Sequence, residues 1–396
     1  MGLTKQPEHR VCIPENVAID KATEDFRRLL NEQLQRTKGM NEDNKFREHR
    51  VDFTKLNKVI IGVIPGDGIG PVIADETVKV LNEVLKDELK EGKVEIRPIE
   101  GLTIENRIAV GESVPHDVLE KIKECHVLLK GPTETPKGGT DGGNMRSANV
   151  TLRAELDLFA NVRPVQVPEK NIDWIFFREN TEGEYVLGSR GIDIPELFSV
   201  DFKVISKAGT ERIARTAMEY ARANGKKKVA VVTKANIIKK CDGNFSKICH
   251  EIAEEFPELE VEDYYVDIMA AKMIDPRVQS NFQVFILPNL YGDILTDEAA
   301  QIQGGVGTAG SANIGSKYAM FEAIHGSAPR MIESGRGQYA NPSSLIKAAS
   351  MMLSHIGKSD AASKIEAVLD KSDSKWKSGV TAKEFGDWFC EMLSGE

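Results

Sequence analysis

The spacing of hydrophobic residues predicts amphipathic helices along much of the chain. Between residues 71 and 89, apolar residues recur every three to four positions, with charged residues on the opposite face. The apolar positions of this stretch are Ala74, Val78, Leu81 and Leu85. Similar patterns predict helices over residues 114–125, 211–225, 344–357, 361–372 and 382–393.

Short apolar runs, typical of buried strands, alternate with these helices. They cover residues 59–61, 94–99, 126–131, 174–180, 202–207, 228–234 and 282–289. Parallel strands need a crossover connection, usually a helix, so this alternation predicts an α/β fold with a substantially parallel sheet covered by helices.

The first 57 residues differ from the rest because they are polar and mixed in charge. One amphipathic candidate stands out over residues 20–36. Its shared apolar face consists of Ala22, Phe26, Leu29, Leu30 and Leu34. We interpret this segment as a helical arm that packs on the body of the protein or on a neighbouring subunit.

Composition limits the classes of protein to consider. The chain has 396 residues, of which 41% are hydrophobic, enough for two or three domains with their own cores. It contains neither a membrane-length apolar run nor the apolar core of a signal peptide, so we expect a soluble, cytoplasmic protein. The net charge of −9 argues against general binding to nucleic acid or anionic membranes.

Cysteine usage points the same way. The five cysteines match neither a zinc site nor a disulfide framework, and we expect free thiols in a reducing compartment. They are Cys12, Cys125, Cys241, Cys249 and Cys390.

The stretch VIPGDGIGP, residues 63–71, resembles the glycine turn of a dinucleotide-binding βα unit but does not match it. In G-x-G-x-x-G the third glycine stands one position later than Gly70, and here Pro71 occupies that position. We therefore expect a non-Rossmann βα turn. Its glycine backbone would allow close approach of a ligand or another loop, and Pro71 would fit the first helical turn.

Three arginines, Arg153, Arg163 and Arg178, stand at the ends of candidate elements in an acidic protein. Forked guanidinium groups hold carboxylates bidentately, so the cluster suggests a small polyanionic substrate; scattered surface ion pairs are the alternative. Ser147 and Asn149 precede Arg153 at a helix start, where they either help to bind an anion or simply cap the helix.

Carboxylates and proton-transfer candidates follow. Asp293 and Asp297 are four residues apart at a helix start, and Asp267 follows another strand. Oxygen ligands of this kind suit Mg²⁺ or Mn²⁺, although a solvated helix face explains the same spacing. Lys234 at a strand end and Tyr185 are candidates for proton transfer, or else ordinary surface residues.

Together these motifs resemble the β-decarboxylating dehydrogenases, the family of isocitrate, 3-isopropylmalate, homoisocitrate and tartrate dehydrogenases. The resemblance runs from about residue 58 to the C-terminus and excludes the N-terminal arm. It rests, in family order, on GDGIGP, KGPT, SANVTLR, LFANVRP, RENTEGEY, VVTKANI, NLYGDILTD, GGVGTAGSANIG, FEAIHGSAP and ANPSS.

The resemblance implies the non-Rossmann fold of that family. Residues 58–158 and 305–396 would form a large α/β domain with the cofactor site. Residues 159–304 would form a smaller domain with the dimer contact, and residues 1–57 the arm. The protein would be a homodimer with shared active sites.

The resemblance also implies roles for single residues. Arg153, Arg163 and Arg178 are similar to the arginines that grip the substrate carboxylates. Thr135 is similar to the threonine between substrate and nicotinamide, in a loop that looks longer than usual. Ser147 and Asn149 match the S-x-N of isocitrate dehydrogenases, which suits a third carboxylate and favours isocitrate over homoisocitrate or 3-isopropylmalate.

Metal and proton-transfer roles follow in the same way. Asp293 and Asp297 are similar to the family's metal ligands, and the partner subunit would supply Asp267. Lys234, also from the partner, resembles the residue that assists removal of the hydroxyl proton, and Tyr185 the one that protonates the enol. Because the whole set is present, the resemblance favours an enzyme over the family's non-catalytic regulatory subunits.

The cofactor would be NADP or NAD. His325, Gly326, Ala328 and Asn341 match the family's adenosine site. Where NAD enzymes usually carry an aspartate, this chain has Arg330, which could bind a 2′-phosphate or face solvent, so the sequence leans slightly towards NADP.

Overall fold

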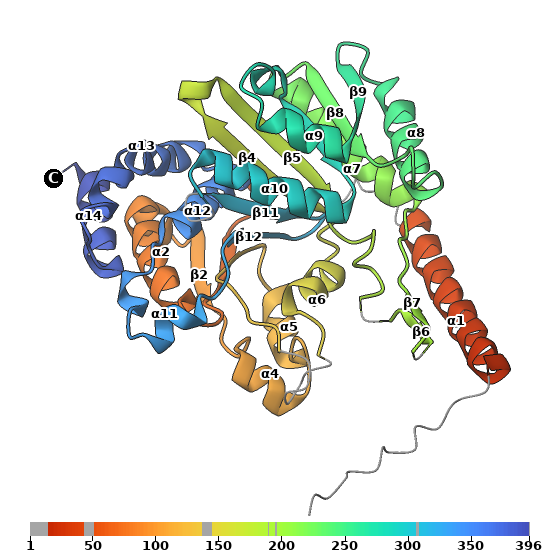
Figure 1. Cartoon of the computed structure of the whole chain (residues 1–396). Helices are drawn as coiled ribbons and strands as arrows, with labels where there is room; N and C mark the ends of the chain where they lie inside the picture. Colours follow the sequence, from red (N-terminus) through yellow and green to blue (C-terminus); the bar gives the residue numbers. More distant parts are fainter. Residues whose placement is uncertain are drawn as a thin grey trace, which may run out of the picture.

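A computed structural model describes residues 15–42, 51–136, 145–188, 190–194, 196–305 and 309–395 (Figure 1). Its strands are β1 Val59–Ile64, β2 Val94–Pro98, β3 Val127–Lys130, β4 Ala160–Val167, β5 Ile172–Glu179, β6 Ile192–Ile194, β7 Phe198–Val200, β8 Lys228–Thr233, β9 Glu260–Tyr265, β10 Val284–Leu287, β11 Gly310–Ile314 and β12 Ala319–Ala323. Its helices are α1 Glu15–Glu42, α2 Gly70–Val84, α3 Lys86–Lys90, α4 Ile104–Val110, α5 His116–Lys123, α6 Ala148–Glu155, α7 Lys207–Ala223, α8 Cys241–Ala253, α9 Val266–Met273, α10 Asn289–Gln303, α11 Pro329–Glu333, α12 Ser343–His355, α13 Ser359–Trp376 and α14 Ala382–Ser394.

Ten strands form one mixed sheet in the order β2-β1-β3-β12-β11-β4-β5-β10-β8-β9. Both ends of the sheet are parallel, as the alternating pattern predicts. The centre is antiparallel, because β4 and β5, and likewise β11 and β12, are joined by short turns. The expectation of a substantially parallel sheet is therefore confirmed, and the antiparallel centre is a feature that the sequence pattern did not predict.

The amphipathic patterns locate most of the long helices. The pattern over residues 211–225 corresponds to α7, which begins earlier, at Lys207, because the Ser206 side chain accepts a hydrogen bond from the Gly209 N–H. The strand-like run over 202–207 forms no named strand and contributes only an isolated bridge between Gly183 and Val204.

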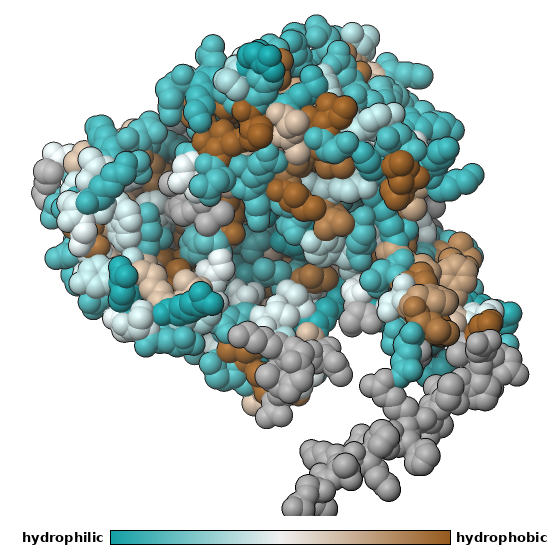
Figure 2. Space-filling view, in the orientation of Figure 1, coloured by the Kyte–Doolittle hydropathy of each residue, from teal (hydrophilic) through white to brown (hydrophobic). Residues whose placement is uncertain are grey.

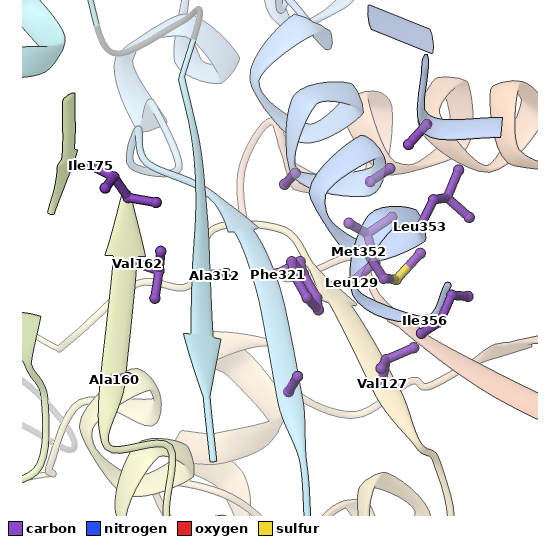
Figure 3. Packing of buried hydrophobic residues seen from close by; sticks show 14 of the residues in the cluster. Val127, Leu129, Ala160, Val162, Ile175, Ala312, Phe321, Met352, Leu353 and Ile356 are labelled. Carbon is purple, nitrogen blue, oxygen red and sulfur yellow. The ribbon is translucent and has the colours of Figure 1, made fainter. Parts of the chain in front are cut away.

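The hydrophobic core lies on both sides of the sheet. Figure 3 shows one part of it, where Met352 and Leu353 of α12 pack near Phe321 of β12. These side chains have at most 1% of their surface exposed. Burying a side chain of this size contributes roughly 1.5–3 kcal/mol, so packing of this kind fixes α12 against the sheet.

The predicted domain division falls inside the sheet. β1, β2, β3, β11 and β12 come from the two segments assigned to the large domain, and β4, β5, β8, β9 and β10 from the segment assigned to the smaller one. The two groups of strands meet where β11 pairs with β4. The division into domains stays a prediction.

The glycine turn before α2 packs against two other loops. Gly66 and Gly68 have φ angles of 77° and 59°, a region that favours glycine. A Cβ atom would lie 2.1 Å from the carbonyl oxygen of Pro132 at Gly66 and of Ser327 at Gly68. The bare backbone therefore serves contact between loops, the second of the two uses expected from the sequence, and Pro71 lies in the first turn of α2 as predicted.

The arm contains the predicted helix, α1, but uses little of its apolar face. Leu29 is buried, whereas Phe26, Leu30 and Leu34 are 41–53% exposed. α1 (red in Figure 1) lies beside the two-stranded ribbon β6–β7 and also contacts α7.

The described cysteines Cys125, Cys241, Cys249 and Cys390 are free, as expected, and Cys12 lies outside the described residues. Within the described part of the chain, no helix is both long and apolar enough to cross a membrane.

Candidate active site

Two of the predicted arginines lie on the same face of the sheet. Arg178 of β5 pairs with Asn161 of β4, and Arg163 lies two residues beyond Asn161, so all three side chains share one face. α10 covers these strands. At Gly292 of α10, a Cβ atom would lie 2.5 Å from the Cγ atom of Arg178, so only glycine leaves room for the buried arginine.

Arg178 is 1% exposed and fully engaged. Its Nε and Nη2 atoms donate to Oδ1 of Asn289 at 2.9 and 2.6 Å, and its Nη1 donates to Asp293. Burial, followed by the charge of Arg153, lowers the pKa of Arg178 to about 10. Burial opposes ionisation of Asp293, but the Arg178 charge and the Tyr185 hydrogen bond lower its pKa overall, so both groups are charged at neutral pH.

The other two arginines lie beside this pair and keep unused donors. Nη1 of Arg163 donates to Oγ1 of Thr296 and Oδ1 of Asp297, both at 2.8 Å. Nη2 of Arg153 lies 3.5 Å from Oε1 of Glu322. The Nε atoms of Arg153 and Arg163 are buried and find no hydrogen-bond partner among the described residues. Buried donors of this kind are costly without an acceptor, so the arginine cluster suits an anion.

Tyr185 completes this group. Its hydroxyl donates to Oδ2 of Asp293 at 2.6 Å, and the guanidinium carbon of Arg178 lies 5.4 Å from the centre of its ring. Burial and then the Asp293 hydrogen bond raise the pKa of Tyr185 to about 12. The phenol therefore keeps its proton throughout the neutral range.

A buried network behind Arg153 was not anticipated. Glu322 pairs with Lys130 at 3.3 Å and accepts a hydrogen bond from Nδ2 of Asn313 at 2.7 Å. Burial opposes its ionisation, but the charges of Lys130 and Arg153 lower the pKa of Glu322 to about 2. The signal in the sequence was a charged residue within each of two apolar strands, which the fold places in neighbouring register.

The predicted residues around the substrate loop are partly assembled. Asn149 accepts a hydrogen bond from the Thr133 hydroxyl at 3.1 Å, and Ser147 lies at the N-cap of α6 without a side-chain capping bond. Thr135 is exposed. Residues 137–144, which belong to the loop expected to be longer than usual, lie outside the described residues.

Two further residues missed by sequence reasoning hold this loop. The carboxylate of Asp67, within the glycine turn, accepts from the Glu134 N–H at 2.7 Å, and Nη1 of Arg107 donates to the Glu134 carbonyl at 2.7 Å. Both side chains are buried. The turn GDGIGP thus positions the residue that precedes Thr135.

Lys234 and Asp267 form a separate pair. Nζ of Lys234 lies 2.5 Å from Oδ1 of Asp267, and the two side chains are 26% and 61% exposed. No group of three or more histidine, cysteine or acidic side chains that could hold a metal ion forms within the described part of one chain. Asp267 therefore does not join Asp293 and Asp297 within one subunit, as expected if it acts in the partner's site.

The predicted cofactor residues lie in the segment between β12 and α12, where Arg330 belongs to the short helix α11. Nδ1 of His325 lies 3.0 Å from the Gly326 carbonyl oxygen, and its Nε2 is buried without a partner among the described residues. Ala328 adopts a left-handed conformation with φ 48°, and Arg330 is exposed. Asn341 accepts a hydrogen bond from the Ser343 N–H at 2.9 Å.

Comparison with known proteins gives consistent relatives. The chain is 40% identical over 326 residues to isocitrate dehydrogenase [NADP] of Rickettsia bellii, covering 79% of this chain and 62% of that protein. It is 38% identical to isocitrate dehydrogenase [NAD] subunit 2, mitochondrial, of Schizosaccharomyces pombe, covering 78% of this chain and 79% of that one. It is 37% identical to homoisocitrate dehydrogenase of Methanocaldococcus jannaschii, covering 75% and 85%. This chain thus spans less than two thirds of the Rickettsia protein.

The fold gives the same result. The crystal structure of isocitrate dehydrogenase from Methylococcus capsulatus matches with a TM-score of 0.73 and 36% identity, over 85% of this chain and 99% of that one. The family model described as isocitrate/isopropylmalate dehydrogenase matches residues 60–386. The chain belongs to the isocitrate/isopropylmalate dehydrogenase family.

Proposed function

We propose that the protein catalyses metal-dependent oxidative decarboxylation of isocitrate to 2-oxoglutarate, with NADP or NAD as hydride acceptor. The observation that carries this proposal is the arginine cluster, in which three arginines lie beside two aspartates. The Nε atoms of Arg153 and Arg163 have no hydrogen-bond partner among the described residues and are donors to which a polyanionic substrate offers acceptors. Bidentate contacts from planar guanidinium groups would orient the carboxylates of the substrate.

The carboxylates suit the divalent cation that the family implies. Asp293 and Asp297 offer oxygen ligands from successive turns of α10, the donor type that Mg²⁺ and Mn²⁺ prefer. Asp267 of a second subunit would complete the set. When bound, the cation would polarise the hydroxyl and carbonyl oxygens of the substrate. Arg163 and Arg178, which pair with these aspartates, would hold their carboxylates in place.

Proton transfer would fall to two side chains. Lys234 of the second subunit would assist removal of the substrate hydroxyl proton. Tyr185 would deliver its phenolic proton to the carbon that loses carbon dioxide, and its pKa of about 12 keeps that proton available at neutral pH. Arg178 would orient this carbon by contacting the substrate carboxylate next to it.

The segment between β12 and α12 suits a nicotinamide cofactor, which would accept the hydride. The buried Nε2 of His325 has no partner among the described residues and could meet a polar group of the adenosine half, beside Gly326, Ala328 and Asn341. Exposed Arg330 would meet a 2′-phosphate, which favours NADP.

The surface position of Lys234 and Asp267 supports the proposal of a homodimer with shared sites. The side chains of Tyr265, Ile268 and Ile294 are 42–56% exposed on or near α9 and α10. Figure 2 shows brown patches on this face of the molecule. A second copy that covers this face would bury these side chains and bring its own Lys234 and Asp267 to the arginine cluster.

A second candidate is homoisocitrate dehydrogenase. The Methanocaldococcus relative carries that name, and Asn149 already accepts the Thr133 hydroxyl, which leaves its amide group as the donor for a more distant carboxylate. 3-Isopropylmalate fits less well, because its alkyl group offers no acceptor to the Ser147 hydroxyl or to the amide group of Asn149.

A steady-state panel tests the proposal. The purified protein is assayed with isocitrate, homoisocitrate and 3-isopropylmalate, each with NAD and NADP, with and without Mg²⁺. We expect the highest kcat/KM with isocitrate and NADP, and loss of turnover without the metal. Asp293→Asn should also abolish turnover. Absence of metal-dependent turnover with all three acids would refute the proposal and favour a non-catalytic regulatory subunit.

A further inference from the structure

The helix α1 contacts the segment that carries Tyr185. Leu29 packs with Val186 and Leu187 in a small buried cluster. Glu32 pairs with Arg190 at 2.5 Å. The family match begins only at residue 60, so this helix is an addition to the matched fold.

Arg36 makes the deepest polar contact of α1. Its Nη2 lies 2.8 Å from Oε1 of Glu182, whose side chain is 1% exposed. On its own helix, Arg36 is oriented by Gln33, whose Oε1 accepts from Nε at 3.0 Å. Glu182 also accepts hydrogen bonds from the backbone N–H and the hydroxyl of Ser206, at 2.8 and 2.5 Å.

The backbone of Glu182 connects it to the arginine cluster. Its carbonyl accepts a hydrogen bond from Nδ2 of Asn289 at 2.9 Å, and Oδ1 of the same asparagine holds Arg178. Arg178 and Tyr185 both bond to Asp293. Arg36 is thus the outer end of a continuous polar chain that ends at the hydroxyl of Tyr185.

Charge balance makes the contribution of Arg36 specific. Glu179 and Glu182 are both buried on one turn, and the Glu179 carboxylate accepts from the Glu182 N–H at 2.7 Å. Burial, followed by the Glu182 charge, raises the pKa of Glu179 to about 7. Arg36 offsets the Glu182 charge, and its removal would leave this buried carboxylate without an ion pair among the described residues, in the turn that leads to Tyr185.

We propose that Arg36 of the N-terminal helix is a positioning residue for catalysis, which holds the turn of residues 179–185 and thereby the phenol of Tyr185. This inference rests on the proposed function for its catalytic consequence. The contact itself does not depend on which acid is oxidised.

Arg36→Met tests the inference against Arg28→Met. Arg28 lies on the same helix and pairs only with its neighbour Asp25 among the described residues, with 65% of its side chain exposed. We expect Arg36→Met to lower kcat roughly tenfold or more, because small displacements of a catalytic group are costly, with KM for the acid changed far less. Arg28→Met should leave both constants unchanged, and Arg36→Lys should restore part of kcat.

A double variant distinguishes positioning from general loss of stability. Arg36→Met with Glu182→Gln removes both charges, and glutamine can still bond to Ser206. We expect this pair to regain much of the kcat that Arg36→Met loses, although it lacks the same arginine. An unchanged kcat in Arg36→Met, or an equal loss in Arg28→Met, would overturn the inference.

Hydrogen exchange supplies a readout that is independent of turnover. Mass spectrometry of the wild type and Arg36→Met should show faster amide exchange in residues 183–188 of the variant, with α12 unchanged. Equal exchange in 183–188 would overturn the inference even if the enzyme is active. Faster exchange in a protein that oxidises none of the acids would support the contact and refute only the proposed function.

Discussion

The two charged pairs in the predicted site differ sharply in their surroundings. Arg178 is 1% exposed where it pairs with Asp293, and Asn289 and Tyr185 supply further hydrogen bonds to this pair. Lys234 and Asp267 lie at the surface, and the aspartate side chain is 61% exposed.

This difference shows which part of the site one subunit can hold in place before ligands bind. The buried pair is held by several partners in a medium where charge interactions are strong, so its geometry is set before ligands bind. The exposed pair is weakened by water and salt and gains little from its one contact. We expect this pair to serve catalysis only when another surface excludes water from it, which agrees with the proposal that it acts in the site of a second copy.

The largest effect is expected when each half of the site is removed in a different subunit. Lys234→Met and Arg153→Ala homodimers should both be nearly inactive. After subunit exchange, half of the dimers are mixed and each has one intact site, so activity should return to about a quarter of the wild type. Kinetic assays before and after mixing measure this recovery.

Subunit exchange needs its own control. Native mass spectrometry should detect the mixed dimers, and mixing Lys234→Met with itself should restore no activity. If mixed dimers form and activity stays at the level of the parents, the two residues serve the same subunit and the shared site is wrong.

A smaller loss is expected when the buried pair keeps its charge but loses its geometry. The guanidinium of Arg178 bonds to Asn289 and Asp293 at the same time. Arg178→Lys puts a point charge on a flexible chain in its place. We expect kcat/KM to fall about a hundredfold, on the order of 3 kcal/mol in transition-state stabilisation. Arg97→Lys is the control, because Arg97 pairs with two carboxylates, Glu95 and Glu124, on the far edge of the sheet.

Equal kinetic constants in Arg178→Lys and the wild type would mean that Arg178 acts through its charge alone and not through the geometry of its guanidinium. The contrast with the surface pair would then lose its basis, since both would act as simple point charges.

Most of the long helices and most strands at the parallel ends of the sheet could be predicted from sequence because their apolar periodicity is local. The antiparallel centre could not. β4 and β11 carry polar residues such as Asn161, Arg163 and Asn313 within the sheet, which makes them look like loops. Their strand character comes from pairing with neighbours distant in sequence, which no short window contains.

The same reason separates the parts of the site that were predicted from those that were missed. Arg153, Arg163 and Arg178 could be predicted because each lies in a short sequence motif that resembles the family. The structure brings the three side chains together. Glu322 was invisible as a functional residue, because its partner Lys130 lies 192 positions away. The role of a charged residue inside an apolar strand can be recognised only when the fold shows which opposite charge lies beside it.

The smallest effect on turnover, with the clearest pH dependence, is expected at Glu322. Glu322→Gln leaves Lys130 buried without its counter-charge and Arg153 without its carboxylate, so we expect unfolding to cost about 3 kcal/mol less at pH 7. KM for the acid should rise several-fold with little change in kcat. Urea unfolding and steady-state kinetics measure the two effects.

The sign of the pH dependence follows from the lowered pKa of about 2 in the folded protein, against an ordinary value of 4.5. A carboxyl group of this kind stabilises the fold above pH 4.5, and this contribution is lost as the pH falls towards 2. The difference between the wild type and Glu322→Gln should therefore shrink from pH 7 to pH 3. Glu88→Gln is the matched control, since Glu88 pairs with Lys358 at 2.9 Å but is partly exposed, and should change stability far less. A difference that stays constant over this pH range would mean that Glu322 acts through packing and not through its charge, and that Arg153 is held by some other contact.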